Sequence, residues 1–382
     1  MEKIKLGDLC VPKKGQIKEE ADVIIDYIDI ASVDNESKKV TGFQTMSFGE
    51  APSRARKAVE KGDILISTVR PNLNAVAILE EDTPNISVAS TGFCILKCKD
   101  NVDNRFVFNF CKSKAFIKDM VSQATGASYP AVNDDIVRSA LIPNYSYEEQ
   151  CHISEILDGM SFTIEKRKVE LQALDELTKA RFVEMFGDPR SNPYGFSKKM
   201  LKDTCKVITG NTPSRSVEEY YGDYVEWIKT DNIVSGLLNP TNASEMLSEE
   251  GMKVGRAVGK DAILMACIAG SIASIGRVCV TDRTVAFNQQ INAVVPEDYN
   301  ILFLYVLFQL SKEYLVEEIN MALKGILSKS KLEEKEFMVP SMELQKEFAT
   351  FVEQVNKSKV AVQKALDETQ MLFDSLMQEY FG

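Results

Sequence analysis

Apolar residues recur at spacings of three and four along two stretches of the chain, 146–188 and 341–382. The first series is Ile153, Leu157, Met160, Ile164, Arg167, Leu171, Leu174 and Thr178, and the second is Phe348, Val352, Val355, Lys359, Val362, Leu366, Thr369, Phe373, Leu376 and Tyr380. This spacing is typical of the heptad seam of paired helices. Each stretch therefore predicts one helix of about 40 residues, roughly 60 Å long.

The ends of the first predicted helix are marked by local sequence signals. Ser146 and Glu149 have the spacing of a capping box, which starts a helix, and Gly187 and Pro189 end it. The seams have equal length, which favours the two helices packing on each other around a pseudo-twofold axis. In the alternative, each helix packs only on its own globular part.

The remaining sequence, 1–143 and 196–340, has the alternating patterns and turn residues of mixed α/β structure. The predicted helical stretches are Arg105–Ser122 and Ile301–Ala322. The predicted strands are Val23–Ile30, Ile64–Thr68, Ala75–Leu79, Phe93–Leu96, Ile263–Ile268, Val278–Val280 and Ile291–Val295.

The second half of the chain repeats the first at an offset close to 195 residues. At that offset Gln150 matches Gln345, and Phe186–Gly187 matches Phe381–Gly382 at the chain's end. In between the offset drifts, and Val88–Ala89 is paired with Val285–Ala286 at 197. Matches in the same order at both ends of both halves indicate one duplicated unit whose loops have changed.

Charge and composition narrow the function classes. The 382 residues carry a net charge of −11, which argues against nonspecific DNA binding. However, the two predicted helices hold 17 acidic and 9 basic residues, so the globular parts are nearly neutral and can still bind DNA. No apolar run is long enough for a membrane span, no leader is apparent, and eight cysteines without a CxxC pair fit a cytoplasmic protein.

Catalytic signatures are absent from the sequence. The single histidine, His152, lies in the first predicted helix and is interpreted as a solvated residue. There is no P-loop lysine motif, no PD-(D/E)xK arrangement and no glycine-rich loop for S-adenosylmethionine. "SNPYG" near residue 193 has one proline too few for the NPPY motif of amino-methyltransferases. We therefore expect a non-catalytic protein with no cofactor and no metal of its own.

A family resemblance follows from the order of several short motifs. These are "LKDTC…GNTPSR" (201–215), "WIKTDNI" (227–233), "SIGRV" (274–278), "FNQQIN" (287–292) and "IPNYSYEEQ…MFGDP" (142–189). Together with the duplication, they resemble the specificity subunit of type I restriction–modification systems over essentially the whole chain. The first half departs from the second, because it lacks "TPS" after Gly15 and has "SVASTGF" in place of "TVAFNQQ".

The resemblance implies an α+β fold of two duplicated mixed α/β target recognition domains joined by two long helices in an antiparallel coiled coil. The expected boundaries are domain 1 at 1–143, spacer helix 1 at 144–188, linker and domain 2 at 189–340, and spacer helix 2 at 341–382. Each domain would recognise one part of a bipartite site on double-stranded DNA.

The resemblance also implies partner subunits. Two methyltransferase subunits would dock on the helices and restriction/translocase subunits would join them, so S-adenosylmethionine, ATP and Mg are expected on the partners. Two alternatives stay open: a DNA-recognition subunit of another modification or defence complex, and a coiled-coil scaffold without DNA binding.

Sequence recognition requires basic and amide side chains on loops that reach base edges and phosphates. In the first half the candidates are Arg54, Arg56, Lys57, Arg70, Ser128, Tyr129 and Asn133. In the second half they are Arg215, Lys229, Asn232, Arg277, Asn288, Gln289, Gln290 and Lys324. Each of these residue types is also common as a solvated surface residue or turn former, and Gln289 and Gln290 are also candidates for hydrogen bonds within the sheet.

Overall fold

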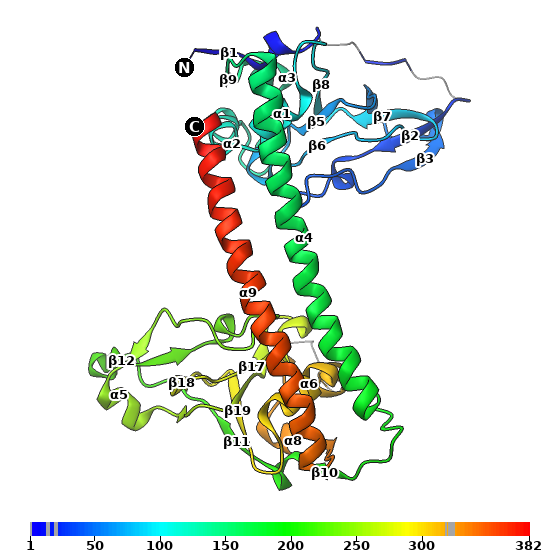
Figure 1. The fold of residues 1–382 in the computed structure, drawn as a ribbon. Coiled ribbons are helices and arrows are strands. Elements are labelled where there is room, and N and C mark those ends of the chain that lie inside the picture. Colours follow the sequence, from blue (N-terminus) through cyan, green and yellow to red (C-terminus); the bar gives the residue numbers. More distant parts are fainter. Residues whose placement is uncertain (1, 13–15, 19–21, 318, 320–324) are drawn as a thin grey trace. The chain divides into compact units, whose positions relative to one another are not determined.

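The computed structural model describes residues 2–12, 16–18, 22–317, 319 and 325–382 (Figure 1). The chain forms two compact units. Unit one contains residues 1–166 and 365–382, and unit two contains residues 167–364. Each of the two long helices contributes one part to each unit, so neither unit is made from one half of the sequence alone.

The described residues of unit one form three small sheets. A mixed sheet has the strand order β3-β2-β7-β4, in which β2 and β7 run parallel. An antiparallel sheet has the order β6-β5-β8, and β1 pairs with β9. The strands are β1 (Lys3–Lys5), β2 (Ile24–Ile28), β3 (Gln44–Ser47), β4 (Ala55–Ala58), β5 (Ile64–Ser67), β6 (Val76–Ile78), β7 (Ile86–Ser90), β8 (Phe93–Leu96) and β9 (Leu141–Pro143).

Unit two repeats the strand order of these sheets and has additional strands. Its mixed sheet has the order β13-β12-β18-β14 with β12 and β18 parallel, its antiparallel sheet is β11-β19-β15-β17, and β10 pairs with β21. The strands are β10 (Lys198–Met200), β11 (Cys205–Thr209), β12 (Tyr221–Ile228), β13 (Met246–Leu247), β14 (Ala257–Val258), β15 (Ile263–Ala266), β16 (Ile268–Ala269), β17 (Val278–Val280), β18 (Val285–Phe287), β19 (Ile291–Pro296), β20 (Gly325–Ile326) and β21 (Glu336–Met338).

The strands that unit two has in addition correspond to single bridges in unit one. The pairing of β11 with β19 has its counterpart in the bridge between Cys10 and Cys98. The pairing of β16 with β20 has its counterpart in the bridge between Val69 and Ala131. The predicted duplication is therefore confirmed as a repeat of topology.

Short helices flank the sheets. They are α1 (Asn104–Lys112), α2 (Lys114–Gln123), α3 (Asp134–Ser139), α5 (Glu249–Val254), α6 (Ile301–Leu310), α7 (Lys312–Val316) and α8 (Lys329–Glu334). The single helix predicted over Arg105–Ser122 is wrong, because Ser113 breaks it. The extended backbone of Ser113 places its hydroxyl to accept the N–H of Phe116, which caps a second helix. The other predicted stretch, Ile301–Ala322, likewise divides at Ser311, and residues 318 and 320–322 lie outside the described part.

The two predicted long helices are confirmed as α4 (Tyr147–Phe186) and α9 (Met342–Phe381). The backbone N–H of Ser146 donates to Glu149 at 2.8 Å and the Ser146 hydroxyl accepts from the Glu149 N–H at 3.3 Å, which confirms the capping box. His152 is exposed on α4, as expected.

Within unit two the parts of α4 and α9 run antiparallel. Asp175 of α4 pairs with Lys359 of α9 at 2.6 Å, whereas Arg181, six residues further along α4, pairs with Glu347 at 3.3 Å, earlier on α9. Phe182 contacts Phe348 in the same direction, with ring centroids 5.4 Å apart. The seam residues Phe348, Val352 and Val355 of α9 are buried in this unit.

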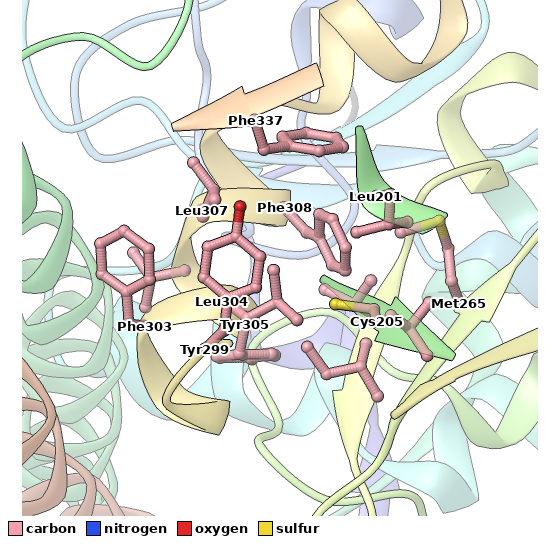
Figure 2. Packing of buried hydrophobic residues seen from close by; sticks show 14 of the residues in the cluster. Leu201, Cys205, Met265, Tyr299, Phe303, Leu304, Tyr305, Leu307, Phe308 and Phe337 are labelled. Carbon is pink, nitrogen blue, oxygen red and sulfur yellow. The ribbon is translucent and has the colours of Figure 1, made fainter. Parts of the chain in front are cut away.

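The cores are made of branched aliphatic and aromatic side chains from sheets and helices. Figure 2 shows this packing in unit two, where Phe303, Tyr305 and Phe308 of α6 share a cluster with Leu201, in the turn after β10, and Met265 of β15. In unit one, Phe106 and Phe110 of α1 have the corresponding role. Burial raises the pKa of Tyr299 and Tyr305 above the usual range, so both phenols remain neutral within this core.

The repeated "FG" residues have the same role in different units. Phe381, at the end of α9, packs in unit one against Phe106 and Phe110, with centroids 5.3 and 5.9 Å away. Phe186, at the end of α4, packs in unit two against Phe303 at 4.9 Å. Each long helix therefore ends in the core of the unit that holds the recognition domain of the other repeat.

A buried glutamine joins helix and domain in both units. The Gln150 amide donates to the Tyr145 carbonyl at 2.9 Å and accepts from the Asp103 N–H at 3.1 Å. Gln345 repeats both bonds, to the Pro340 carbonyl at 2.9 Å and from the Asn300 N–H at 2.8 Å. The two glutamines that match in the sequence therefore make the same pair of hydrogen bonds. These bonds fix α4 to the start of α1 and α9 to the start of α6.

Among the described residues, no helix has both the length and the apolar character needed to cross a membrane.

Candidate nucleic-acid interface

The ends of the parallel strand pairs carry the same backbone turn in both units. After β2, residues 30–32 form a 3₁₀ turn, and the Ser32 carbonyl accepts the Thr41 N–H. After β12, residues 230–232 form the same turn, and the Asn232 carbonyl accepts the Thr241 N–H. The two turns match at an offset of 200, which makes Tyr27 equivalent to Trp227.

In unit two, a loop after β11 is fixed to this strand end. The Tyr221 hydroxyl donates to the Pro213 carbonyl at 2.7 Å, and the Trp227 indole donates to the Asn211 carbonyl at 3.3 Å. These bonds place the guanidinium of Arg215 over two rings, 4.6 Å from the centroid of Tyr221 and 5.2 Å from that of Trp227. Such stacking holds the cation while leaving N–H donors available.

Glu245 completes the cluster in unit two. Its carboxylate pairs with Arg215 at 2.6 Å and with Lys229 at 2.5 Å, and Lys229 also lies 5.2 Å from the Trp227 centroid. The hydrogen bond from Lys229, with a further one from Arg215, holds the pKa of Glu245 below its usual range. The side chain of Arg215 nevertheless remains 57% exposed.

In unit one, a different loop delivers a cation to the equivalent place. Arg54, before β4, donates from Nε to the Tyr27 hydroxyl at 3.2 Å and from Nη2 to Asp29 at 2.7 Å. Asp29 in turn accepts the Ile30 N–H at 2.8 Å and so caps the turn. Arg54 is 55% exposed, close to the value for Arg215.

Several predicted contact residues have hydrogen-bond or ion-pair partners within the domain. Lys57 is 17% exposed and pairs with Asp134 at 2.8 Å, and Arg56 donates to the Ala55 carbonyl at 2.7 Å. Arg277 donates to the carbonyls of Ser274 and Thr230, and buried Asn232 bonds within its own turn. These bonds hold loops in place, and sequence alone did not distinguish them from exposed donors.

The remaining predicted residues that the structure describes lie near the same strand ends or on neighbouring loops. Arg70 stacks on Tyr129 at 4.8 Å, beside a surface cavity that both residues line, and Tyr129 is 68% exposed. Ser128 is exposed next to it, and Asn133 caps α3 by accepting the Ile136 N–H. Buried Asn288 bonds to Gln290, exposed Gln289 accepts from the Thr212 hydroxyl, and Lys324 lies outside the described residues.

Sequence reasoning missed the residues that position the exposed arginines, namely Tyr27, Asp29, Tyr221, Trp227 and Glu245. A usable signal existed, because "DYID" (26–29) and "EWIK" (226–229) place an aromatic residue and a polar residue at the same offset. Asp29 lies in this signal, whereas Glu245, the carboxylate partner in unit two, comes from the segment before β13 and had no such signal.

Two repeated α/β domains, two long helices and an exposed arginine held at the equivalent strand end of each domain define a class of tandem recognition proteins. The model of the type I restriction modification DNA specificity domain matches residues 1–174 and again residues 193–369. The chain therefore belongs to this family and is a DNA sequence-specificity subunit of a type I restriction–modification system.

Curated relatives agree with this assignment. The chain is 24% identical over 333 residues to the type I restriction enzyme HindI specificity subunit of Haemophilus influenzae, covering 67% of this chain and 71% of that protein. It is 23% identical over 344 residues to the MjaIX specificity subunit of Methanocaldococcus jannaschii, covering 83% and 76%.

Solved structures show the same fold. The S subunit of a type I restriction–modification system from M. genitalium has a TM-score of 0.63 at 14% identity, covering 100% of this chain and 96% of that one. A second similar chain comes from work on the structural basis of complex assembly and conformational transition of the type I R-M system. It has a TM-score of 0.60 at 22% identity, covering 100% of this chain and 97% of that one.

Proposed function

We propose that this specificity subunit recognises a bipartite DNA site, one half through each recognition domain. The observation that supports this is a repeated framework with non-equivalent loops: the strand order and the glutamine bonds are the same in both units, whereas the exposed arginine comes from before β4 in one and from after β11 in the other. Different loops on one framework provide different base contacts.

We further propose that the subunit is non-catalytic and cytoplasmic, and that it acts within a complex. Two methyltransferase subunits dock on α4 and α9, and restriction/translocase subunits join them. Large apolar side chains exposed on these helices support docking: Phe162 is 60% exposed, Val360 70%, Met371 66% and Leu372 56%. S-adenosylmethionine, ATP and Mg are then bound by the partners, which supply methyl transfer and translocation.

The test is a domain exchange followed by mapping of methylated bases in host DNA. Residues 196–340 are replaced by the equivalent region of a related specificity subunit, with the methyltransferase gene unchanged. One half of the recognised sequence is expected to change and the other half to stay the same, because each domain has its own sheets and its own exposed arginine.

The matched control is the reciprocal exchange of residues 1–143, which should change the opposite half. If either exchange alters both halves, the two domains do not recognise DNA independently. If deleting the gene leaves host methylation unchanged, the chain does not direct methylation at all.

A further inference from the structure

Both units place a half-exposed arginine on the same buried aromatic position, although the two arginines come from unrelated places in the repeat. Tyr27 and Trp227 are 1% and 3% exposed, and each is the next-to-last residue in the parallel strand pairing of its mixed sheet. Arg54 reaches Tyr27 from the loop before β4, and Arg215 reaches Trp227 from the loop after β11. Arrival at one position from two loops indicates that the position itself matters for function.

Each arginine is also neutralised by a carboxylate from its own unit. Asp29 pairs with Arg54 at 2.7 Å, and Glu245 pairs with Arg215 at 2.6 Å. A carboxylate this close weakens attraction to a phosphate, because the cation's charge is compensated and the carboxylate is itself repelled. The arrangement is therefore poorly suited to binding the DNA backbone.

The same arrangement suits hydrogen bonding to a base edge. Arg54 uses Nε and Nη2 for Tyr27 and Asp29, and its Nη1 has no hydrogen-bond partner among the described residues. Arg215 uses Nη2 for Glu245, and its Nε and Nη1 are likewise without such a partner in the described part of the chain. A guanidinium fixed by a carboxylate and by an aromatic side chain, through the phenol hydroxyl for Arg54 and the ring faces for Arg215, presents its remaining N–H groups in a defined direction, with less rotamer freedom to lose on binding.

We propose that Arg54 and Arg215 are equivalent specificity residues, each of which recognises a guanine in one half of the DNA site. The inference rests on the proposed function and deepens it. Arginine donates to the O6 and N7 acceptors that guanine presents in the major groove, and this pairing discriminates against the other bases. Asp29 and Glu245 are positioning residues, which set the direction of the guanidinium without contacting the base.

The test uses the complex of this chain with its methyltransferase subunits and a library of randomised DNA duplexes, with sequencing of the bound fraction. Arg54→Gln is expected to lower the preference for guanine at one position of one half-site, by roughly 5- to 150-fold. Arg215→Gln should do the same at one position of the other half-site. All other positions should keep their preferences.

Matched controls remove an exposed, carboxylate-paired cation elsewhere in the same unit. Arg105, 41% exposed and paired with Glu80, serves for unit one, and Lys253, 67% exposed and paired with Glu250, serves for unit two. Arg105→Gln and Lys253→Gln should leave every base preference unchanged.

Glu245→Gln separates positioning from a purely structural role. Loss of the compensating charge should raise affinity for all sequences at low salt and steepen the salt dependence, while the guanine preference falls. If the variant changes neither the salt dependence nor the guanine preference, Glu245 does not position Arg215, and the proposal loses its basis in unit two.

Three outcomes would overturn the proposal. Uniform weakening across all sequences would identify the arginines as phosphate contacts. If one substitution alters the base preferences of both half-sites, the assignment of one arginine to each half-site is wrong. The same holds if neither substitution alters any base preference. By contrast, a wild-type complex that enriches no bipartite sequence would refute the proposed function itself.

Discussion

The two helix-terminal phenylalanines should stabilise opposite units. Phe186 belongs to the first repeat but packs in unit two, and Phe381 belongs to the second but packs in unit one. Their side chains are 0% and 1% exposed. Substitution by alanine removes a buried ring and leaves a cavity, which costs about 3–5 kcal/mol.

Hydrogen exchange measured by mass spectrometry can locate this loss. A decrease of 3–5 kcal/mol in the free energy of opening corresponds to exchange about 100- to several-thousand-fold faster, since each 1.4 kcal/mol is a factor of ten. Phe186→Ala should accelerate the slowest amides of β15 and β19. Phe381→Ala should accelerate those of β5 and β8. Phe162→Ala, at a site on α4 that is 60% exposed, is the control and should change neither set by more than a few fold.

The result that refutes this reasoning is faster exchange in the domain of the same repeat. If Phe186→Ala loosens β5 and β8 while β15 and β19 stay protected, Phe186 does not stabilise unit two. Equal acceleration in both units would instead mean that the two units unfold as one cooperative body.

Other measurements address stability, spacing and catalysis. Burial lowers the pKa of Lys112 from 10.5 to about 8. Between these two pH values the unfolded chain binds more protons than the folded chain, so the free energy of unfolding of unit one should rise with pH in this range. Lys112→Met should abolish this rise in denaturant titrations and gain up to roughly 3 kcal/mol at pH 7, whereas Lys114→Met, at a side chain 82% exposed, should have little effect. Four residues inserted after Lys166 together with four after Lys364 should lengthen each helix by about 6 Å and the spacer between half-sites by about two base pairs, with the half-sites unchanged in the methylome. The purified chain alone should transfer no methyl group from S-adenosylmethionine to DNA in a radiolabel assay, and any transfer above background would contradict its assignment as non-catalytic.

The fold was largely predictable because its signals are local or repeated. A heptad spacing, a capping box and an ordered set of matches at about 195 residues do not depend on tertiary contacts. Register was less predictable: the sequence pairs Val88 with Val285, whereas the sheets place Val88 opposite Tyr27 and Ala286 opposite Trp227, an offset of 198. A one-residue shift in the alignment of the two repeats cannot be detected where neighbouring residues are all small and apolar. Such a shift nevertheless exchanges the residues on the two faces of a strand.

The candidate site was predictable only in part because its geometry is non-local. Arg215 and Lys229 have the right chemistry in the sequence, but their shared partner Glu245 lies on a different segment, next to β13. Lys57 and Arg277 have the same chemistry, but Lys57 pairs with Asp134 and Arg277 donates to the Thr230 carbonyl. What separates the two groups is the partner of each charged side chain, which depends on strand order and loop path rather than on residue type.

The exchange of helix ends also explains why the framework repeats so faithfully while the loops do not. Each unit takes its domain from one repeat and its terminal phenylalanine from the other, so the core around Phe106 must accept Phe381 as the core around Phe303 accepts Phe186. A change in either core has to remain compatible with a residue of the other repeat. The residues that hold Arg54 and Arg215 belong to the same repeat as the arginine itself, so these contacts do not carry this constraint. Variation can therefore concentrate on the surfaces proposed to recognise bases, while the cores and the helix ends stay matched.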